Sequence, residues 1–133
     1  MAFQFPIRVY YEDTDAGGIV YHANYLNFCE RARTEYLRHL GIEQDTYLEH
    51  NIAFVVKSME IDFKTAAKFN DELVVNTEVI NSKRASVEFS QIIMNKLQQV
   101  VFTAKVKVAC VDTTQMKPMA IPEKILGVLK SAS

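Results

Sequence analysis

Residues 22–41 read HANYLNFCERARTEYLRHLG, and this stretch decides the fold of the chain. Its core-facing side chains recur at steps of three and four residues, which is the spacing of an amphipathic helix. Gly41 suits the position just after a helix, where a left-handed backbone is favoured. The sequence therefore predicts one long helix from about His22 to Leu40. The predicted stripe consists of Leu26, Cys29, Arg33, Tyr36, Leu37 and Leu40, widened by Phe28 and Ala32.

Most of the remaining chain has the pattern of strands. A β-prone segment over 5–11 precedes the helix, and four strand-like stretches follow it at about 52–63, 72–81, 86–94 and 99–111. Turn candidates between them predict an antiparallel meander. The alternation is clearest in two stripes, Val87, Phe89, Gln91 and Ile93, and Phe102, Ala104, Val106, Val108 and Cys110.

One helix cannot cover both faces of five strands, but it can fill the concave side of one curled sheet. The sequence thus predicts a single α+β domain over 1–133, with short helices near 43–50 and 123–130. Ile92, Val101 and Val111 lie off the main stripes. We therefore expect the other face of the sheet to be covered by a second copy of the chain.

Composition excludes several function classes. The net charge is −1, and acidic and basic residues are interspersed, so no basic stripe predicts nucleic-acid binding. The first residues lack the apolar region of a signal peptide, and the longest apolar run, 52–56, is too short to span a membrane. Cys29 and Cys110 are expected to be reduced, buried thiols. These features together predict a cytoplasmic protein.

The loop Glu12-Asp13-Thr14-Asp15-Ala16-Gly17-Gly18 places carboxylates and two glycines between a strand and the long helix. A solvated acidic turn, or an aspartate that caps the helix, is the simpler interpretation. Paired glycines favour a functional one, because they let backbone approach another group closely. His22 follows at the helix start, where free amides favour a developing oxyanion. A carboxylate facing such amides can carry out acyl transfer without a metal.

Two other chemistries fit the sequence less well. Cys29 and His22 share a helix face but are separated by roughly 10 Å along the axis, too far for a nucleophile–base pair. Glu12, Asp13, Asp15 and His22 match no familiar metal-ligand spacing, so no metal and no other cofactor is expected.

Residues 8–25, RVYYEDTDAGGIVYHANY, closely resemble the active-site signature of the 4-hydroxybenzoyl-CoA thioesterase family. Within it the chain is most similar to the Tol-Pal-associated (YbgC-type) acyl-CoA thioesterases. The resemblance continues through 30–35, 54–62, 83–86 and 117–122. It implies a hotdog fold, in which a five-stranded antiparallel sheet wraps one long central helix. It also implies hydrolysis of acyl-CoA by a homotetramer built from dimers, with active sites at the subunit interface.

The resemblance also implies roles for single residues. Asp15 matches the catalytic carboxylate, which acts as nucleophile or as general base on water. His22 matches the residue at the helix start whose backbone amide faces the thioester carbonyl. Gly18 and Tyr25 match positions around the substrate, whereas Asp13 is expected to be structural. Ala66-Ala67 and Asn70-Asp71 depart from the usual pattern of relatives, which leaves the acyl preference open.

Coenzyme A carries phosphates, so a local basic cluster is expected where it binds. Lys83 and Arg84, at a turn between strands, are the candidates, although two solvated turn residues would look the same in sequence. Two alternatives to acyl-CoA hydrolysis stay open. The thioester substrate could be carried by acyl carrier protein, or the chain could be an acyl-thioester-binding adaptor in envelope or phospholipid metabolism.

Overall fold

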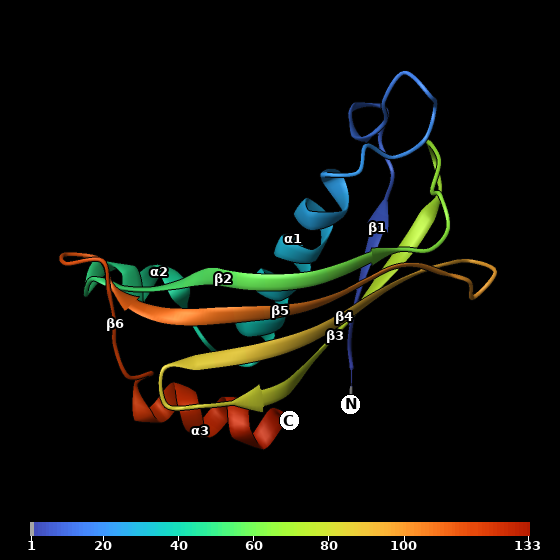
Figure 1. Cartoon of the computed structure of the whole chain (residues 1–133). Coiled ribbons are helices and arrows are strands. Elements are labelled where there is room, and N and C mark those ends of the chain that lie inside the picture. The colour runs from blue at the N-terminus through green and yellow to red at the C-terminus, as the bar shows by residue number, and fades with distance from the viewer. Residues whose placement is uncertain (1) are drawn as a thin grey trace.

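A single curled antiparallel sheet holds helix α1 on its concave side (Figure 1). The structure is a computed structural model, and it describes residues 2–133. The strands are β1 (Phe3–Arg8), β2 (Ile52–Phe63), β3 (Glu72–Ser82), β4 (Ser86–Asn95), β5 (Val100–Asp112) and β6 (Lys117–Pro118), and the helices are η1 (Tyr11–Asp13), α1 (Asn24–His39), α2 (Gln44–Glu49) and α3 (Glu123–Ala132).

The hotdog prediction is confirmed, with two differences in detail. The five long strands lie in the order β1-β3-β4-β5-β2, and β6 is a short additional strand that pairs with β5. The predicted meander holds for β3, β4 and β5. β2 does not pair with β3, the next strand in sequence, but with β5. Local turn signals predict only neighbouring pairs, so sequence reasoning missed the crossover that puts β2 on an edge.

The two predicted stripes form the inner face of the sheet. In register, Ile93 lies opposite Phe102 and Phe89 opposite Val106, and all four side chains are buried. Phe28 of α1 is also fully buried in the same core. Since strand side chains alternate between faces, one registered pair fixes the inward residues of both strands. None of the helices in residues 2–133 is long and apolar enough to cross a membrane.

The reason given for a partner on the outer face needs correction. Ile92 is 36% exposed, as expected, but Val101 and Val111 are only 1% and 7% exposed, so their own chain already covers them. The amides of Lys64 and Thr65 donate to the Val101 carbonyl, and Val111 lies opposite Pro118 of β6. Four of the other large exposed apolar side chains lie along the edge strand β2: Val55, Val56, Ile61 and Phe63.

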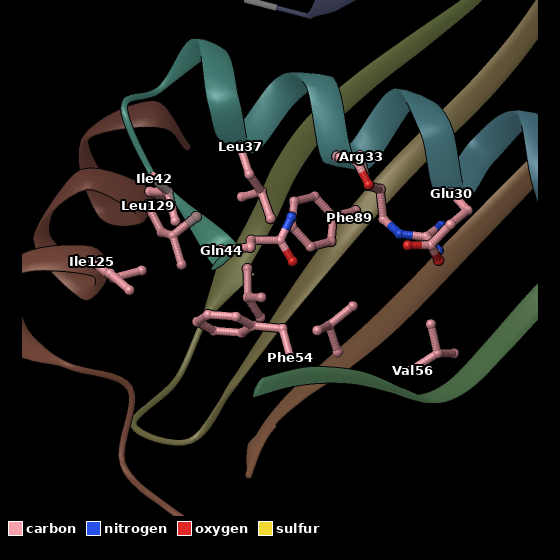
Figure 2. Close-up of a pocket in the computed structure, with 13 residues that line it drawn as sticks. Glu30, Arg33, Leu37, Ile42, Gln44, Phe54, Val56, Phe89, Ile125 and Leu129 are labelled. Carbon is pink, nitrogen blue, oxygen red and sulfur yellow. The ribbon is translucent and has the colours of Figure 1, made fainter. Parts of the chain in front are cut away.

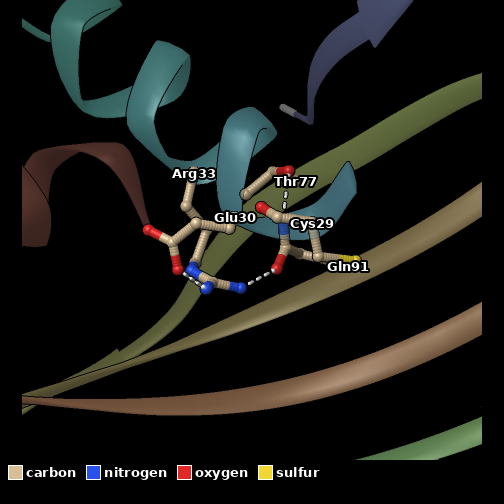
Figure 3. Close-up of polar contacts among 5 residues, drawn as sticks. All are labelled: Cys29, Glu30, Arg33, Thr77 and Gln91. Atoms are coloured by element: carbon tan, nitrogen blue, oxygen red, sulfur yellow. Dashed lines mark hydrogen bonds and ion pairs between the residues drawn. The ribbon is translucent and has the colours of Figure 1, made fainter. Parts of the chain in front are cut away.

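A polar network crosses the core between α1 and the sheet (Figure 3). Gln91 is fully buried on the otherwise apolar stripe of β4. Its amide donates to the Cys29 carbonyl at 2.9 Å and to Thr77 Oγ1 at 3.0 Å, and its oxygen accepts from Arg33 Nη1 at 2.8 Å. Each polar atom of Gln91 therefore has a partner, as a buried amide requires.

Gln91→Leu should destabilise the protein by about 2–4 kcal/mol, because the apolar side chain leaves Arg33 and Thr77 buried without this partner. Urea unfolding followed by circular dichroism measures the change. Ser90→Ala, one residue away on the outer face, is the matched control and should alter the free energy of unfolding by less than about 0.5 kcal/mol. Equal stability of the two variants would show that the network contributes nothing.

Candidate active site

The loop between β1 and α1 folds into a small hairpin. Thr14 and Val20 form an antiparallel bridge, and the Asp15 amide donates to the Ile19 carbonyl at 3.0 Å. The Gly18 amide closes the turn by donating to the Asp15 carbonyl at 3.0 Å. Gly18 has a φ of +78°, which a residue with a side chain adopts only at a cost. The predicted substrate-binding residue Gly18 thus shapes the turn that carries Asp15.

The Asp15 carboxylate lies on the exposed surface of this hairpin. Its Oδ1 accepts one hydrogen bond, from the Gly17 amide at 2.8 Å. A Cβ added at Gly17 would lie 3.2 Å from that oxygen, so glycine here leaves room for the carboxylate. The glycine pair predicted that the backbone comes close to another group, and in the structure that group is the Asp15 carboxylate. The remaining lone pairs of the carboxylate face solvent and are free for chemistry.

Asp13, two residues earlier, has the contacts of a structural carboxylate. It is 5% exposed, and it accepts hydrogen bonds from the Tyr10 amide and from Asn24 Nδ2, both at 2.8 Å. Its carbonyl accepts from the Tyr21 amide at 2.8 Å. Asp13 thereby ties the hairpin to the first residue of α1. Sequence reasoning missed Asn24, although it is a polar residue at a helix start, within the matched motif.

The N-terminus of α1 is open. Ala23 occupies the cap position, and no side chain caps the helix. The Asn24 amide donates to the Tyr21 carbonyl, but within residues 2–133 no partner is recorded for the amides of His22 and Ala23. A 16-residue helix therefore presents free N–H groups and its positive dipole end to whatever occupies this place. The alternative that Asp15 caps the helix does not hold.

The side chains of His22 and Tyr25 both lie next to Phe63, but they differ in burial. His22 is exposed, and its ring lies 6.5 Å from that of Phe63, at the end of β2. Tyr25 is buried, stacks on Phe102 with centroids 5.1 Å apart, and accepts a hydrogen bond from the Ala67 amide at 3.2 Å. Burial raises the pKa of the Tyr25 hydroxyl. Within one chain, Tyr25 supports the site from beneath.

Lys83 and Arg84 are not near Asp15 in the same chain. They follow β3 at the end of the sheet beside α3, whereas the hairpin contacts Ala67 and Lys68, before β3 begins (Figure 1). The length of β3 separates the two places by about 30 Å. Both side chains are exposed, and the Arg84 carbonyl accepts from the Ile121 amide. Phe63, at the end of β2, is a neighbour of His22 that the sequence analysis did not identify.

The cysteines have the environment of core residues, as predicted. Cys29 is fully buried, and burial raises the pKa of its thiol to about 12. Burial also raises the pKa of Cys110. A thiol with such a pKa is protonated at neutral pH and is a poor nucleophile. In the described part of the chain, no group of three or more His, Cys, Asp or Glu side chains is placed to hold a metal ion.

Comparison with known proteins identifies a consistent set of relatives. A model of the thioesterase-like superfamily matches residues 9–129. The acyl-CoA thioesterase YbgC of Haemophilus influenzae is 56% identical over 92% of this chain and 90% of its own length. The acyl-CoA thioester hydrolase YbgC of Escherichia coli is 44% identical over 96% of both chains. A probable thioesterase from Bartonella henselae superimposes with a TM-score of 0.85 at 35% identity, covering 92% of this chain and all of that one.

Proposed function

This chain belongs to the thioesterase-like superfamily and is an acyl-CoA thioesterase, and from that premise we propose that Asp15 carries the hydrolytic step. The observation that carries the proposal is the pairing of two features on one hairpin. Asp15 is an exposed carboxylate with a single hydrogen bond, and its hairpin leads into an uncapped helix N-terminus, to which Asp13 ties it. A thioester between them would meet a nucleophile or base on one side and amide donors on the other.

The free amides of His22 and Ala23 are positioned for the thioester oxygen. Attack on the carbonyl carbon moves negative charge to this oxygen, and preorganised N–H donors stabilise that charge more than they stabilise the neutral ground state. The backbone of His22 supplies this group whatever its side chain does. The imidazole, next to Phe63, is left to position the substrate.

Asp15 can complete the reaction by either of two routes. As a general base it takes a proton from water while the water oxygen bonds to the carbonyl carbon, and it returns that proton to the departing CoA thiolate. As a nucleophile it forms an anhydride with the acyl group and expels the thiolate, and water then cleaves the anhydride. Both routes yield the carboxylic acid and CoA. Both routes also require a carboxylate with an oxygen that accepts no internal hydrogen bond. Asp15 has such an oxygen, whereas both carboxylate oxygens of Asp13 accept hydrogen bonds.

Asp15→Asn should lower kcat/KM for acyl-CoA by about 10² to 10⁴-fold, because the amide can neither attack nor accept a proton. Turnover of a panel of acyl-CoA esters, detected by release of free thiol, measures the change. Glu78→Gln, at an exposed carboxylate on β3 away from the hairpin and from β2, is the control and should retain full activity. Near-normal turnover by Asp15→Asn would remove Asp15 from the mechanism. A wild-type protein inactive on every ester would favour the adaptor function.

We further propose that two chains pair through the edge strand β2 and that such dimers build a tetramer. The 12-residue strand β2 has β5 on one side and exposes Val55, Val56, Ile61 and Phe63. Antiparallel pairing of two β2 strands would bring the start of one beside the end of the other. Phe63 and His22 lie at that end, so the partner's strand would border the catalytic hairpin.

Ile61→Glu should shift the protein toward a monomeric mass at micromolar concentration, because symmetric pairing places two new like charges at one interface. Light scattering during size-exclusion chromatography measures this mass. Ile80→Glu is the matched control, since Ile80 is exposed to 44% and Ile61 to 40% but Ile80 lies on β3, away from the edge. A wild-type monomer, or equal effects of both substitutions, would contradict pairing through β2.

The same pairing supports a role for Lys83 and Arg84 in holding CoA for the other subunit. Ser86, just after them, lies opposite Ala109, which lies opposite Val55 near the start of β2. Lys83 and Arg84 of the partner subunit would therefore come to the end of the sheet where Asp15 lies, although the two places are about 30 Å apart in one chain.

Replacing both Lys83 and Arg84 by alanine should raise KM for acyl-CoA about tenfold or more, through lost phosphate contacts, and leave KM for a short thioester without the nucleotide unchanged. Steady-state kinetics on both substrates measures the difference. Lys105→Ala with Lys107→Ala, on β5, controls for general loss of positive charge. Equal losses on both substrates would rule out a CoA contact.

The carrier and the cellular setting stay predictions. Parallel assays with the same acyl group on CoA and on acyl carrier protein would separate the two carriers. A cytoplasmic location and a link to the Tol-Pal system are consistent with the resemblance, and cell fractionation would test the first of these.

A further inference from the structure

A pocket of about 70 Å³ opens between α1, the start of β2 and α3 (Figure 2). It lies away from the catalytic hairpin, because Arg33 in its wall is about 16 Å along the helix from His22. Apolar side chains form most of its lining, among them Leu37, Phe54, Phe89 and Leu129. Its polar lining residues are Glu30, Arg33, Thr34 and Gln44.

Arg33 is the only cation in the lining, and it is 5% exposed. Its Nη1 donates to Gln91 at 2.8 Å and its Nη2 to Glu30 at 2.6 Å (Figure 3). A guanidinium has five N–H donors, so three have no recorded partner among residues 2–133. Gln91 is itself held by Cys29 and Thr77, which fixes the position of the guanidinium. A buried, oriented guanidinium with free donors is suited to bind a carboxylate.

The counter-ion of Arg33 is displaceable. The Glu30 side chain is 62% exposed, whereas the Arg33 side chain is 6% exposed. A mostly solvated carboxylate gains little from an ion pair, because water competes for it. Glu43 and Asp45 line a neighbouring pocket that shares Thr34, Ile42 and Gln44 with this one, so acidic groups also border the entrance. A ligand must therefore be held mainly by Arg33 and by burial of its tail.

We propose that this pocket binds the carboxylate of a short aliphatic acid, with the carboxylate on Arg33 in place of Glu30 and the alkyl tail against Leu37, Phe54 and Phe89. The volume limits the tail, because an apolar cavity that accepts benzene is about 150 Å³. A short chain fits this space and an aromatic ring does not. The site is separate from the reacting atoms and needs no change at Asp15.

If the proposed function is correct, such a carboxylate has two sources. One is the free acid that thioester hydrolysis releases. The other is the far carboxylate of a dicarboxylic acyl group, because pairing through β2 places this pocket beside the partner's catalytic hairpin. The chemistry on Arg33 is the same in both cases.

Glu30→Gln decides the proposal, because it removes the competitor for Arg33 and leaves the pocket otherwise intact. Calorimetric titration of the full-length protein with butyrate, butanol and butylamine should show binding of butyrate alone. Glu30→Gln should tighten butyrate binding about threefold to fivefold. Glu35→Gln is the matched control, since Glu35 makes the equivalent pair with Arg38 on the same helix, and it should change nothing. Arg33→Gln should weaken binding at least about tenfold.

Titrations in the Asp15→Asn background separate this proposal from the proposed function, because binding at Arg33 should persist where turnover is lost. Steady-state kinetics distinguish the two sources. If the pocket binds the far carboxylate of the acyl group, Glu30→Gln should lower KM for succinyl-CoA relative to KM for butyryl-CoA. If butyrate inhibits instead and the KM ratio is unchanged, the free acid is the ligand. Absence of butyrate binding, or binding that Glu30→Gln weakens, would overturn the proposal.

Discussion

One helix has to cover the concave face of a five-stranded sheet, and this constraint shapes the rest of the molecule. α1 packs against β1 and β3, and Phe28 and Tyr36 are buried there. The other side of the concave face, along β2, is left with half-exposed apolar residues such as Ile61 and Phe63. The open side borders both the helix start and the pocket at Arg33. The proposed chain pairing, catalytic site and ligand pocket would therefore all use this same uncovered strip.

Two aspartates of one loop show how environment assigns roles. Asp13 is buried and accepts two hydrogen bonds from groups that must keep their positions, Tyr10 and Asn24. Asp15 is exposed and accepts one, from Gly17. The first carboxylate holds the hairpin on the helix, and the second is left available. α1 also begins without a side-chain cap, and the amides of His22 and Ala23 at its start have no recorded partner within residues 2–133.

Local patterns in the sequence predicted the helix, the strands and their inner faces. The helix begins at Asn24 instead of His22, and β2 has the expected bounds. The alternation from Val87 to Ile93 predicts which side chains of this strand are buried even when its neighbouring strands are unknown, because the period of two is a property of the strand alone. The motif around Asp15 predicted a candidate site in this segment, where the structure has an exposed carboxylate close in sequence to unbonded amides. The reason for a glycine at position 17 became clear only from the structure, in which a side chain there would crowd the Asp15 carboxylate.

What could not be predicted depends on contacts between distant segments. The place of β2 beside β5 and the cover over Val101 follow from the crossover, which leaves no local signal. The separation of Lys83 from Asp15 follows from the length of β3 and from the contact of the hairpin with residues before that strand. Gln91 was assigned to the correct face, but its partners Cys29 and Thr77 lie 62 and 14 residues away. A polar residue on an apolar stripe indicates that a partner exists, and only the fold identifies it.

The edge strand β2 is the feature that supports the proposed pairing of two chains. A long strand with exposed apolar side chains and unpaired backbone groups is a template for association, and natural proteins blunt such edges with bulges, prolines or charges. β2 has one bulge, between Val56 and Ser58, and its charged residues Lys57, Glu60 and Asp62 are exposed. Glu60 and Asp62 alternate with Ile61 and Phe63, so they lie on the opposite face of the strand and leave those two apolar side chains uncovered. An identical strand, antiparallel to the first, satisfies the backbone and covers both apolar ends at once, because the pairing is closed by its own symmetry.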